Sequence, residues 1–478
     1  MQNRESLNVK PAGRKPKPVP KEATGIAERI DGLIAKGRHP EALVLAETLT
    51  REKPRDPSAW NVLGVVARTM GQPAVAVGAY TRALEINPDH PAARSNIGNA
   101  WRDMQRFDEA INCHRAALAQ APSSASLWSN LGVALRDATR YEEALVAYEQ
   151  ALRLEPTNAR ILLDRGQVLL MLGHYERGWR DFEARWSLPE LQPGRFAKPA
   201  WDGSVRKTDT LLLWPEQGFG DTILCARYVE LARARVGSVT LVCQRELRRL
   251  FENLPGVDTL VIKGDALPPY DVHAPLMSLP RFFTPSLRHI PPPVRLTVAS
   301  SARSKLTSLL EPHHDRLKVG IVWSGSLTFK NNRLRASTLD RFLDLMAVPG
   351  VRLYSLQKGP RSDDIQALGA TSLVTDLAPL LEDFADTAAA IQSLDLVVMT
   401  DSSVAHLAGS LGKPVWNLLS KMPYWLYGPD GDNTRWYPSM RLFRQPHHGD
   451  WDGVFSEAKK ALAIHRASMA RSNGTGSR

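Results

Sequence analysis

The chain has few cysteines and no long hydrophobic run. Only three of its 478 residues are cysteine, at positions 113, 225 and 243, and their spacing fits no metal-binding motif. Each thiol is therefore interpreted as a small buried hydrophobe in a reducing compartment. No run of about 18 apolar residues occurs, which argues against a transmembrane helix. Residues 1–22 lack the apolar core of a signal peptide and are rich in Lys, Arg and Pro, so we expect a disordered basic tail and a cytoplasmic protein.

The sequence also lacks signatures of nucleic-acid or metal binding. A net charge of +11 would suit nucleic acid, an anionic membrane surface or small anionic substrates. The charges are dispersed, however, and no DNA- or RNA-binding motif occurs among them, so nucleic acid is not expected as a partner. The pairs His313-His314 and His447-His448 do not have the spacing of metal ligands. We therefore expect neither a metal nor a resident cofactor.

A period of 34 residues runs through the first third of the chain. It places the same small residues and prolines at fixed positions: Gly64, Gly98, Gly132 and Gly166; Ala76, Ala110 and Ala144; Pro88, Pro122 and Pro156. Small residues let two helices cross closely, and proline ends the second helix of each pair. This pattern resembles the tetratricopeptide repeat and predicts a helical solenoid over residues 23–190.

One face of the predicted solenoid carries a ladder of polar residues. Arg68, Arg102 and Arg136 share one position of the period, and Asn96 and Asn130 share another. In repeat proteins that hold extended peptides, asparagine can hydrogen-bond the peptide backbone and charged residues can select its side chains. We interpret the ladder as a partner-binding surface; the alternative is that these residues form solvated helix faces.

Strand-like apolar runs alternate with helical segments after a linker at 191–204. The predicted strands are 210–214, 239–243 and 259–262, followed by a second series at 317–323, 351–356, 394–399 and 415–419. Such alternation is typical of parallel sheets. We predict two Rossmann-like domains, 205–300 and 316–446, then a C-terminal helix and tail at 447–478. Ligands of such folds bind where the strands end.

Two of the strand-end loops combine glycine with charge. In the first loop, Gly218 and Gly220 would let the backbone approach a ligand, and Asp221 is either a helix N-cap or a general base that takes a proton from a hydroxyl. The loop after residue 323 contains Ser324 and Gly325 and continues into a basic stretch.

Positive side chains of that stretch suit a pyrophosphate. Lysine acts as a point charge and arginine as a bidentate fork, so Lys330 and Arg335 are candidate phosphate ligands. A solvated basic loop is the alternative. Gln357, after the next strand, could touch a nucleotide base or ribose.

The segment 394–414 reads as a strand that leads directly into a helix. Unpaired N–H groups and the helix dipole favour an anion at such a helix start. Asp401 or Ser402 could cap this helix, and Ser403 follows within the expected phosphate-binding turn. His406, one turn further, points either at the phosphate or into the core.

Together these motifs resemble glycosyltransferases of the GT-B fold. More closely, they are similar to the heptosyltransferase group (glycosyltransferase family 9) in its bacterial form fused to tetratricopeptide repeats. The resemblance covers roughly residues 201–451. It is carried by WPEQGFGD at 214–221, KVGIVWSGS at 318–326, YSLQKG at 354–359, DFADTAAAI at 383–391, MTDSSVAHLAGSLGKPVW at 399–416 and WYPSMRLFRQ at 436–445.

The resemblance implies a nucleotide-sugar donor in the C-terminal domain and an acceptor against the N-terminal domain. It matches Asp221 to the catalytic base. The donor-binding residues implied are Lys330, Asp401, Ser402, Ser403 and His406. Arg335 and Gln357, proposed above from their positions in the loops, complete the predicted donor site. The expected reaction is a single inverting displacement that requires no metal.

The acceptor is expected to be a protein recruited by the repeats. Repeat-fused bacterial relatives are associated with protein glycosylation, for example of flagellin or another surface protein. Two alternatives stay open: transfer to a cell-surface polysaccharide or lipid-linked glycan, and a non-catalytic repeat scaffold whose α/β part senses nucleotide.

Overall fold

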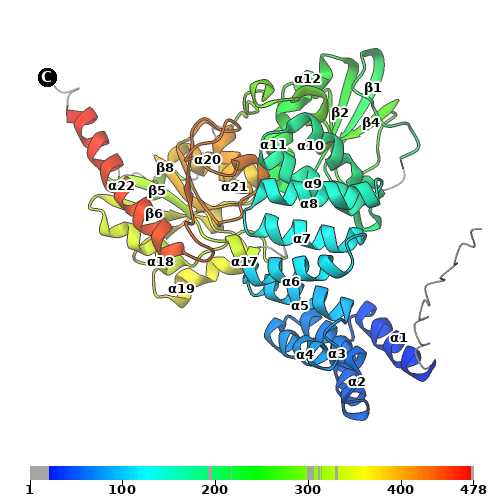
Figure 1. Ribbon diagram of the computed structural model, residues 1–478. Helices are drawn as coiled ribbons and strands as arrows, with labels where there is room; N and C mark the ends of the chain where they lie inside the picture. The colour runs from blue at the N-terminus through cyan, green and yellow to red at the C-terminus, as the bar shows by residue number, and fades with distance from the viewer. Residues whose placement is uncertain are drawn as a thin grey trace, which may run out of the picture. The chain divides into compact units, whose positions relative to one another are not determined.

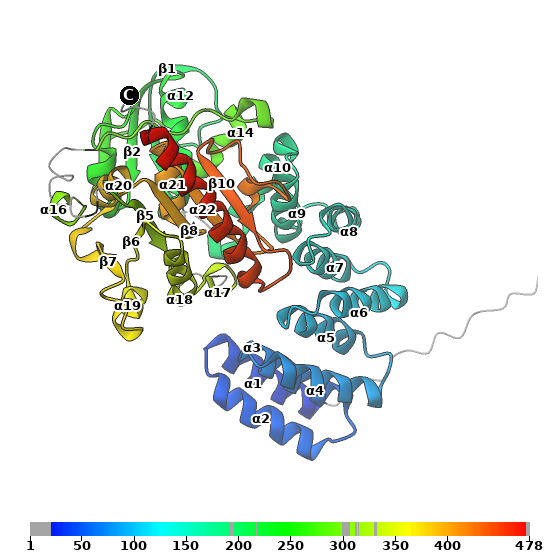
Figure 2. The same cartoon turned by 90° about the vertical axis from the view of Figure 1, so that its left-hand side faces the viewer.

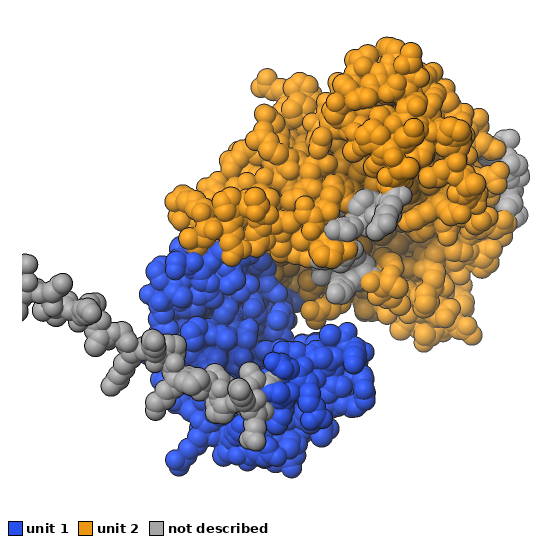
Figure 3. Space-filling view, turned by 90° about the vertical axis from the view of Figure 1, so that its right-hand side faces the viewer, with its two compact units in different colours: residues 1–134 blue, residues 135–478 orange. Residues whose placement is uncertain are grey.

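The computed structural model describes residues 21–191, 196–216, 218–298, 306–310, 313, 315–328 and 332–474. The chain divides into two compact units, residues 1–134 and 135–478 (Figure 3). The second unit contains every strand that the structure describes, together with the last repeat helices. Within the described ranges, no helix is both long and apolar enough to cross a bilayer. Lys330 and residues 1–20 of the predicted tail lie outside the described residues.

The first part of the chain is an N-terminal helical solenoid of tetratricopeptide type (Figure 1). Its helices are α1 Lys21–Ala35, α2 His39–Glu52, α3 Pro57–Thr69, α4 Pro73–Ile86, α5 Pro91–Asp103, α6 Phe107–Gln120, α7 Ala125–Asp137, α8 Tyr141–Leu154, α9 Ala159–Met171 and α10 Tyr175–Phe182. The helices α4, α6 and α8 each end shortly before one of the periodic prolines, as predicted.

The periodic glycines lie where the two helices of a repeat touch. A Cβ atom on Gly98 would lie 2.8 Å from the His114 ring, and one on Gly64 would overlap the Tyr80 ring. Because a packed interior has no room for the extra atom, only glycine allows these helix pairs to approach so closely. The predicted role of the glycine that recurs every 34 residues, close packing of two helices, is confirmed at both positions.

The first α/β region contains a four-stranded parallel sheet in the order β3-β2-β1-β4. Its strands are β1 Arg206–Trp214, β2 Val236–Cys243, β3 Thr259–Ile262 and β4 Val272–Pro275. Its helices are α11 Phe219–Cys225, α12 Val229–Arg233, α13 Arg248–Phe251 and α14 Pro280–Phe283. The first three strands match the predicted runs, whereas β4 was not predicted, because its sequence VHAP contains a histidine and ends in proline.

The second α/β region has a six-stranded parallel sheet in the order β10-β9-β8-β5-β6-β7. This is the doubly wound order. The chain runs outward from β5 through β6 to β7, returns to place β8 beside β5, and then runs outward on the other side through β9 to β10. Its strands are β5 Leu317–Val322, β6 Val351–Ser355, β7 Val374–Asp376, β8 Leu396–Thr400, β9 Val415–Leu419 and β10 Met440–Arg444. The edge strands β7 and β10 were not predicted.

Helices cover this sheet and close its core. They are α16 Thr307–Leu310, α17 Asn332–Arg335, α18 Leu339–Leu343, α19 Asp364–Ala367, α20 Phe384–Ser393, α21 Ser403–Ser410 and α22 Trp451–Gly474. The long C-terminal helix α22 runs along the sheet (Figure 2). Its Phe455 packs at 4.9 Å, edge to face, on Phe342 of α18, in the same core as the buried Val398 of β8. Burial of these apolar side chains holds α22 to the sheet.

Helix α10, the last of the array, packs against both α/β regions. The Trp179 indole donates to the carbonyl of Thr284 in the first region (3.1 Å) and lies edge-on to Trp425 of the second, with ring centroids 5.1 Å apart. Tyr175 accepts a hydrogen bond from the Trp436 indole at 2.9 Å. Large aromatic side chains that bury both their faces and their polar atoms give strong, directional contacts. The end of the repeat array is therefore part of the same core as the two sheets.

Replacement of Trp179 by alanine tests this contact. We expect a loss of about 3–5 kcal/mol in the free energy of unfolding, because the change leaves a cavity and an unpaired carbonyl. Urea unfolding followed by circular dichroism measures it. Val146→Ala on α8 is the control: that side chain is 58% exposed, so its change should stay within about 0.5 kcal/mol. Equal effects of the two variants would contradict the assigned role of α10.

Candidate functional site

A cavity of about 940 Å³ lies at the carboxyl ends of strands from both sheets. Loops after β1, β5, β6 and β8 line it, because parallel strands all end at the same edge of a sheet. Ser324, after β5, and Asp401, after β8, stand on either side of the point where the strand order reverses. The volume is typical of a small-molecule site.

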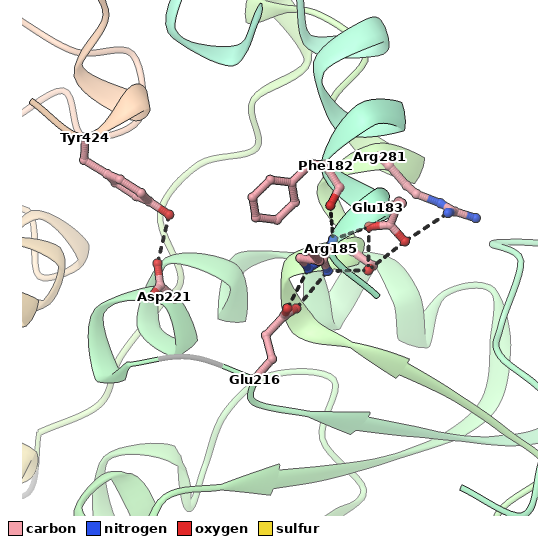
Figure 4. Close-up of polar contacts among 8 residues, drawn as sticks. Phe182, Glu183, Arg185, Glu216, Asp221, Arg281 and Tyr424 are labelled. Atoms are coloured by element: carbon pink, nitrogen blue, oxygen red, sulfur yellow. Dashed lines mark hydrogen bonds and ion pairs between the residues drawn. The ribbon is translucent and has the colours of Figure 1, made fainter. Parts of the chain in front are cut away.

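Asp221 faces this cavity from the first α/β region. Helix α11 begins at Phe219 and its N-cap is Gly218, so Asp221 is the third helical residue and not the N-cap. The Tyr424 hydroxyl, from the second region, donates to Asp221 Oδ1 at 3.0 Å (Figure 4). Burial raises the pKa of Asp221 to about 6; the Tyr424 hydrogen bond opposes this and the Glu216 charge adds to it. A carboxylate with such a pKa is suited to accept a proton near neutral pH.

The two α/β regions touch closely at Gly220. A Cβ on Gly220 would lie 2.7 Å from Cδ2 of His406 on α21, so this contact requires glycine; the approach of a ligand to Gly220 stays a prediction. His406 lines the cavity, and its Nδ1 lies 3.1 Å from the Tyr437 hydroxyl. Burial lowers the pKa of His406 to about 3, with smaller effects from Arg227 and Arg335. The imidazole is therefore neutral near pH 7, packed on one side and open to the cavity on the other.

The start of helix α21 also lines the cavity, next to α11. Ser402 is its N-cap and accepts from the amide of Val404, while Ser403 is the first helical residue and also lines the cavity. The Asp401 carboxylate is buried, and burial raises its pKa. It accepts from the Tyr427 hydroxyl (2.9 Å) and pairs with Arg335 at 3.4 Å. Asp401 thus holds Arg335 at the cavity wall, where both were predicted to lie.

Gln357 shapes the cavity through the backbone. Its Oε1 accepts from the amides of Trp323 and Ser324 at 3.1 and 2.9 Å, and its Nε2 donates to the carbonyls of Ser324 and Lys358. These bonds use the full donor and acceptor capacity of the amide. Gln357, which was predicted to touch a base or ribose, therefore joins the loops after β5 and β6.

The loop after β5 is fixed by one asparagine. Asn332 donates to the Ser324 hydroxyl and accepts from the Gly325 amide, both at 3.1 Å. Ser324 and Gly325 line the cavity, as predicted. The predicted phosphate ligand Lys330 falls outside the described residues.

The DFADTAAAI segment connects the two α/β regions. Asp383 is the N-cap of α20, and with Asp386 it binds Arg249 of α13 at 3.2 Å each. Phe384 packs on Phe219 with ring centroids 4.9 Å apart. These contacts hold the two walls of the cavity together next to Asp221.

The predicted partner-binding ladder consists of residues that bind one another. Hydrogen bonds or ion pairs join Arg68 to Asp103 (2.6 Å), Asn96 to Asn61 (3.0 Å), Asn130 to Ser95 (3.2 Å) and Arg136 to Asp164 (3.0 Å), while Arg102 lies 3.6 Å from Asp103. The partners of the hydrogen-bonded pairs belong to successive repeats, so the ladder stabilises repeat stacking. Its use by a partner stays a prediction.

Sequence reasoning missed the tyrosines Tyr424 and Tyr427. Both lie in the aromatic stretch that follows β9 and each donates to a site carboxylate, Asp221 and Asp401 respectively. Their position in the sequence could have indicated this role. They follow β9, and because β9 is parallel to β8, the loop after β9 lies at the same edge of the sheet as the loop after β8.

Comparison with known proteins defines the first part of the chain and leaves the second open. Family models described as "TPR repeat" and "Tetratricopeptide repeat" match residues 134–173, and 67–132 and 28–91, respectively. The fold therefore defines a tetratricopeptide-repeat array followed by an α/β region with two parallel sheets.

Protein FlbA of Caulobacter vibrioides is 27% identical over 341 residues, which cover 63% of this chain and 54% of FlbA. The chain thus matches about half of the length of that relative. Solved structures that match include two repeat proteins: MamA from Desulfovibrio magneticus RS-1 (20% identity, 36% of this chain and 96% of that one, TM-score 0.30) and a thermophilic TPR protein of Thermus thermophilus (19%, 35% and 92%, TM-score 0.33). With TM-scores this low, they carry no argument about the site.

Two glycine substitutions separate packing from loop flexibility. Gly220→Ala would place a methyl group against His406, and we expect a loss of about 1–3 kcal/mol in the free energy of unfolding. Gly218→Ala should cost less than about 1 kcal/mol, because its Cβ meets only ordinary contacts. Urea unfolding of both variants measures the difference, and an equal or reversed order would contradict the close contact of α11 with α21.

Proposed function

We propose that this protein is a glycosyltransferase of GT-B type that uses a nucleotide-sugar donor. The observation that carries the proposal is the cavity at the ends of two parallel sheets, whose lining combines the Asp221 carboxylate with the start of α21 and Arg335. A transfer reaction needs such a combination of groups: a base beside the acceptor, and hydrogen-bond donors and positive charge beside the leaving group.

In the proposed reaction, Asp221 accepts the proton of an acceptor hydroxyl. The hydroxyl oxygen then attacks the anomeric carbon of the donor sugar, and the bond from that carbon to the phosphate oxygen breaks with its electron pair. The leaving nucleotide carries the new negative charge. The turn at Ser402 and Ser403 and the guanidinium of Arg335 line the same cavity and are proposed to stabilise that charge.

The acceptor is proposed to be a protein. Tetratricopeptide repeats are suited to binding protein segments, and repeat helices α8–α10 belong to the same compact unit as the cavity. A scaffold that only senses nucleotide would not need a half-buried carboxylate with a raised pKa next to the cavity, so Asp221 favours the enzyme over that alternative.

Replacement of Asp221 tests the base. Asp221→Asn should lower the transfer rate by about 100-fold or more while it leaves nucleotide affinity within about twofold. In the unchanged protein, kcat/KM should fall as the pH drops through about 6, because Asp221 accepts a proton only as the carboxylate. Transfer assays over a pH range of about 5 to 8 measure both effects. A variant that turns over at the normal rate would overturn the assignment.

A thermal-shift screen of nucleotide sugars tests the donor. We expect one donor, and its free nucleoside diphosphate, to raise the melting temperature in a concentration-dependent way, since a ligand that binds only the folded state stabilises it. Arg335→Gln should weaken that shift, whereas Arg281→Gln, whose charge lies beside Glu183 and not in the cavity lining, should leave it unchanged. No shift with any nucleotide or nucleotide sugar would contradict the proposal.

A further inference from the structure

Arg185 is a deeply buried charged group at the junction of the repeats and the α/β region. It lies in the 3-10 turn η1, Glu183–Ser187, directly after helix α10, and its side chain is only 1% exposed. It forms a bidentate pair with Glu216, with Nε to Oε2 at 2.7 Å and Nη2 to Oε1 at 3.0 Å (Figure 4). The partner carboxylate is 6% exposed.

Every N–H of Arg185 has an acceptor. Besides Glu216, Nη1 donates to the carbonyl of Phe182 (3.0 Å) and to Glu183 (2.7 Å), and Nη2 donates to the Ser278 hydroxyl (2.8 Å). The acceptors come from the end of the array and from two places in the first α/β region, and they use all the donors of the guanidinium. The guanidinium also stacks on the rings of Phe182 and Trp186, at 4.4 and 4.2 Å. The planar fork of the guanidinium fixes the orientation of its partners, and its positive charge balances theirs.

Glu216 belongs to the loop that carries the proposed base. The loop leaves β1 at Trp214 and enters α11 at Phe219, and Asp221 is the third residue of that helix. A shift of Glu216 would therefore move the start of α11. The charge of Glu216 is also close enough to affect Asp221, since it raises the pKa of that carboxyl.

We propose that Arg185, a residue of the repeat array, is a positioning residue for Asp221: it holds Glu216 and with it the loop that aims the base into the cavity. This rests on the proposed function of Asp221. It follows that the turn after the last repeat is a component of the catalytic site and not only a connection to it. An α/β region cut free from this turn would keep its sheets but lose the fixed position of its base.

The variants separate charge from position. In Arg185→Met the carboxylate of Glu216 stays buried without its counter-ion, which is costly. In Arg185→Met/Glu216→Gln the negative charge at position 216 is removed, but the bidentate contact that holds the loop is still missing. Arg185→Lys keeps the charge and loses the fork, and it serves if the methionine variant does not fold. The matched control is Arg281→Met, which removes a 37% exposed partner of the same Glu183 at 3.0 Å and does not touch Glu216.

The expected results differ between the variants in the full-length chain. Arg185→Met should lower kcat by about tenfold to 100-fold with the donor KM nearly unchanged, because a small displacement of a base is costly. Its acidic pH limb should move to higher pH, since Glu216 then lacks its counter-ion. In the double variant, the acidic limb of the pH profile should return toward that of the unchanged protein while kcat stays low. Arg281→Met should behave as the unchanged protein.

Amide hydrogen exchange of residues 216–221 tests the positioning role independently of activity. Faster exchange in Arg185→Met or Arg185→Lys, but not in Arg281→Met, supports the positioning role even if the unchanged protein transfers no sugar, in which case only the proposed function fails. Unchanged exchange in both Arg185 variants overturns the positioning role. A loosened loop with unchanged kcat and pH limb would also overturn it, because Arg185 would then be only structural.

Discussion

The buried contact of helix α10 and its following turn with both α/β regions is the constraint on which the second unit depends. Trp179 reaches the first region through Thr284 and the second through Trp425, and Arg185 adds the bidentate pair with Glu216. Aromatic packing supplies the apolar burial, while the ion pair fixes orientation. Every donor of the buried Arg185 has an acceptor, and these acceptors lie at the end of the array, in the loop after β1 and at Ser278, so one side chain joins all three.

The cavity shows how one desolvated environment gives two carboxylates different tasks. Burial raises the pKa of both Asp221 and Asp401. Asp401, however, is paired with Arg335 and so serves to hold a cation in place, whereas the side-chain hydrogen bond to Asp221 comes from the neutral phenol of Tyr424. A carboxyl with a raised pKa and a neutral partner can exchange a proton near neutral pH, and one paired with a cation cannot do so as readily. The proposed division into base and leaving-group sides follows from this difference in partners.

Much of the architecture could be predicted from the sequence. The 34-residue period located the repeat helices because small residues recur where the two helices of a repeat pack closely, as Gly98 packs on the His114 ring. Long apolar runs indicated most of the strands, since buried parallel strands are apolar on both faces. The strands β4, β7 and β10 were missed because polar residues or proline interrupt their apolar runs.

Within the site, too, some features could be predicted from the sequence and others could not. Strand-end positions predicted the cavity lining at Asp221, Asp401 and His406. Side-chain partners, however, depend on contacts between distant segments. For that reason Tyr424 was missed, and so were the bonds of Gln357 to the backbone, while its contact with a ligand stays a prediction.

The sequence by itself determined the repeat array, the two parallel sheets and the strand ends at which a site could form, because local periodicity and the geometry of parallel strands are written into neighbouring residues. Only the tertiary structure decided which side chains meet. It placed Tyr424 on Asp221, His406 against Gly220, and Arg185 of the array on Glu216. These pairs are separated by 31 to 203 positions, and such contacts arise from burial and charge pairing across the folded core, which no local pattern encodes.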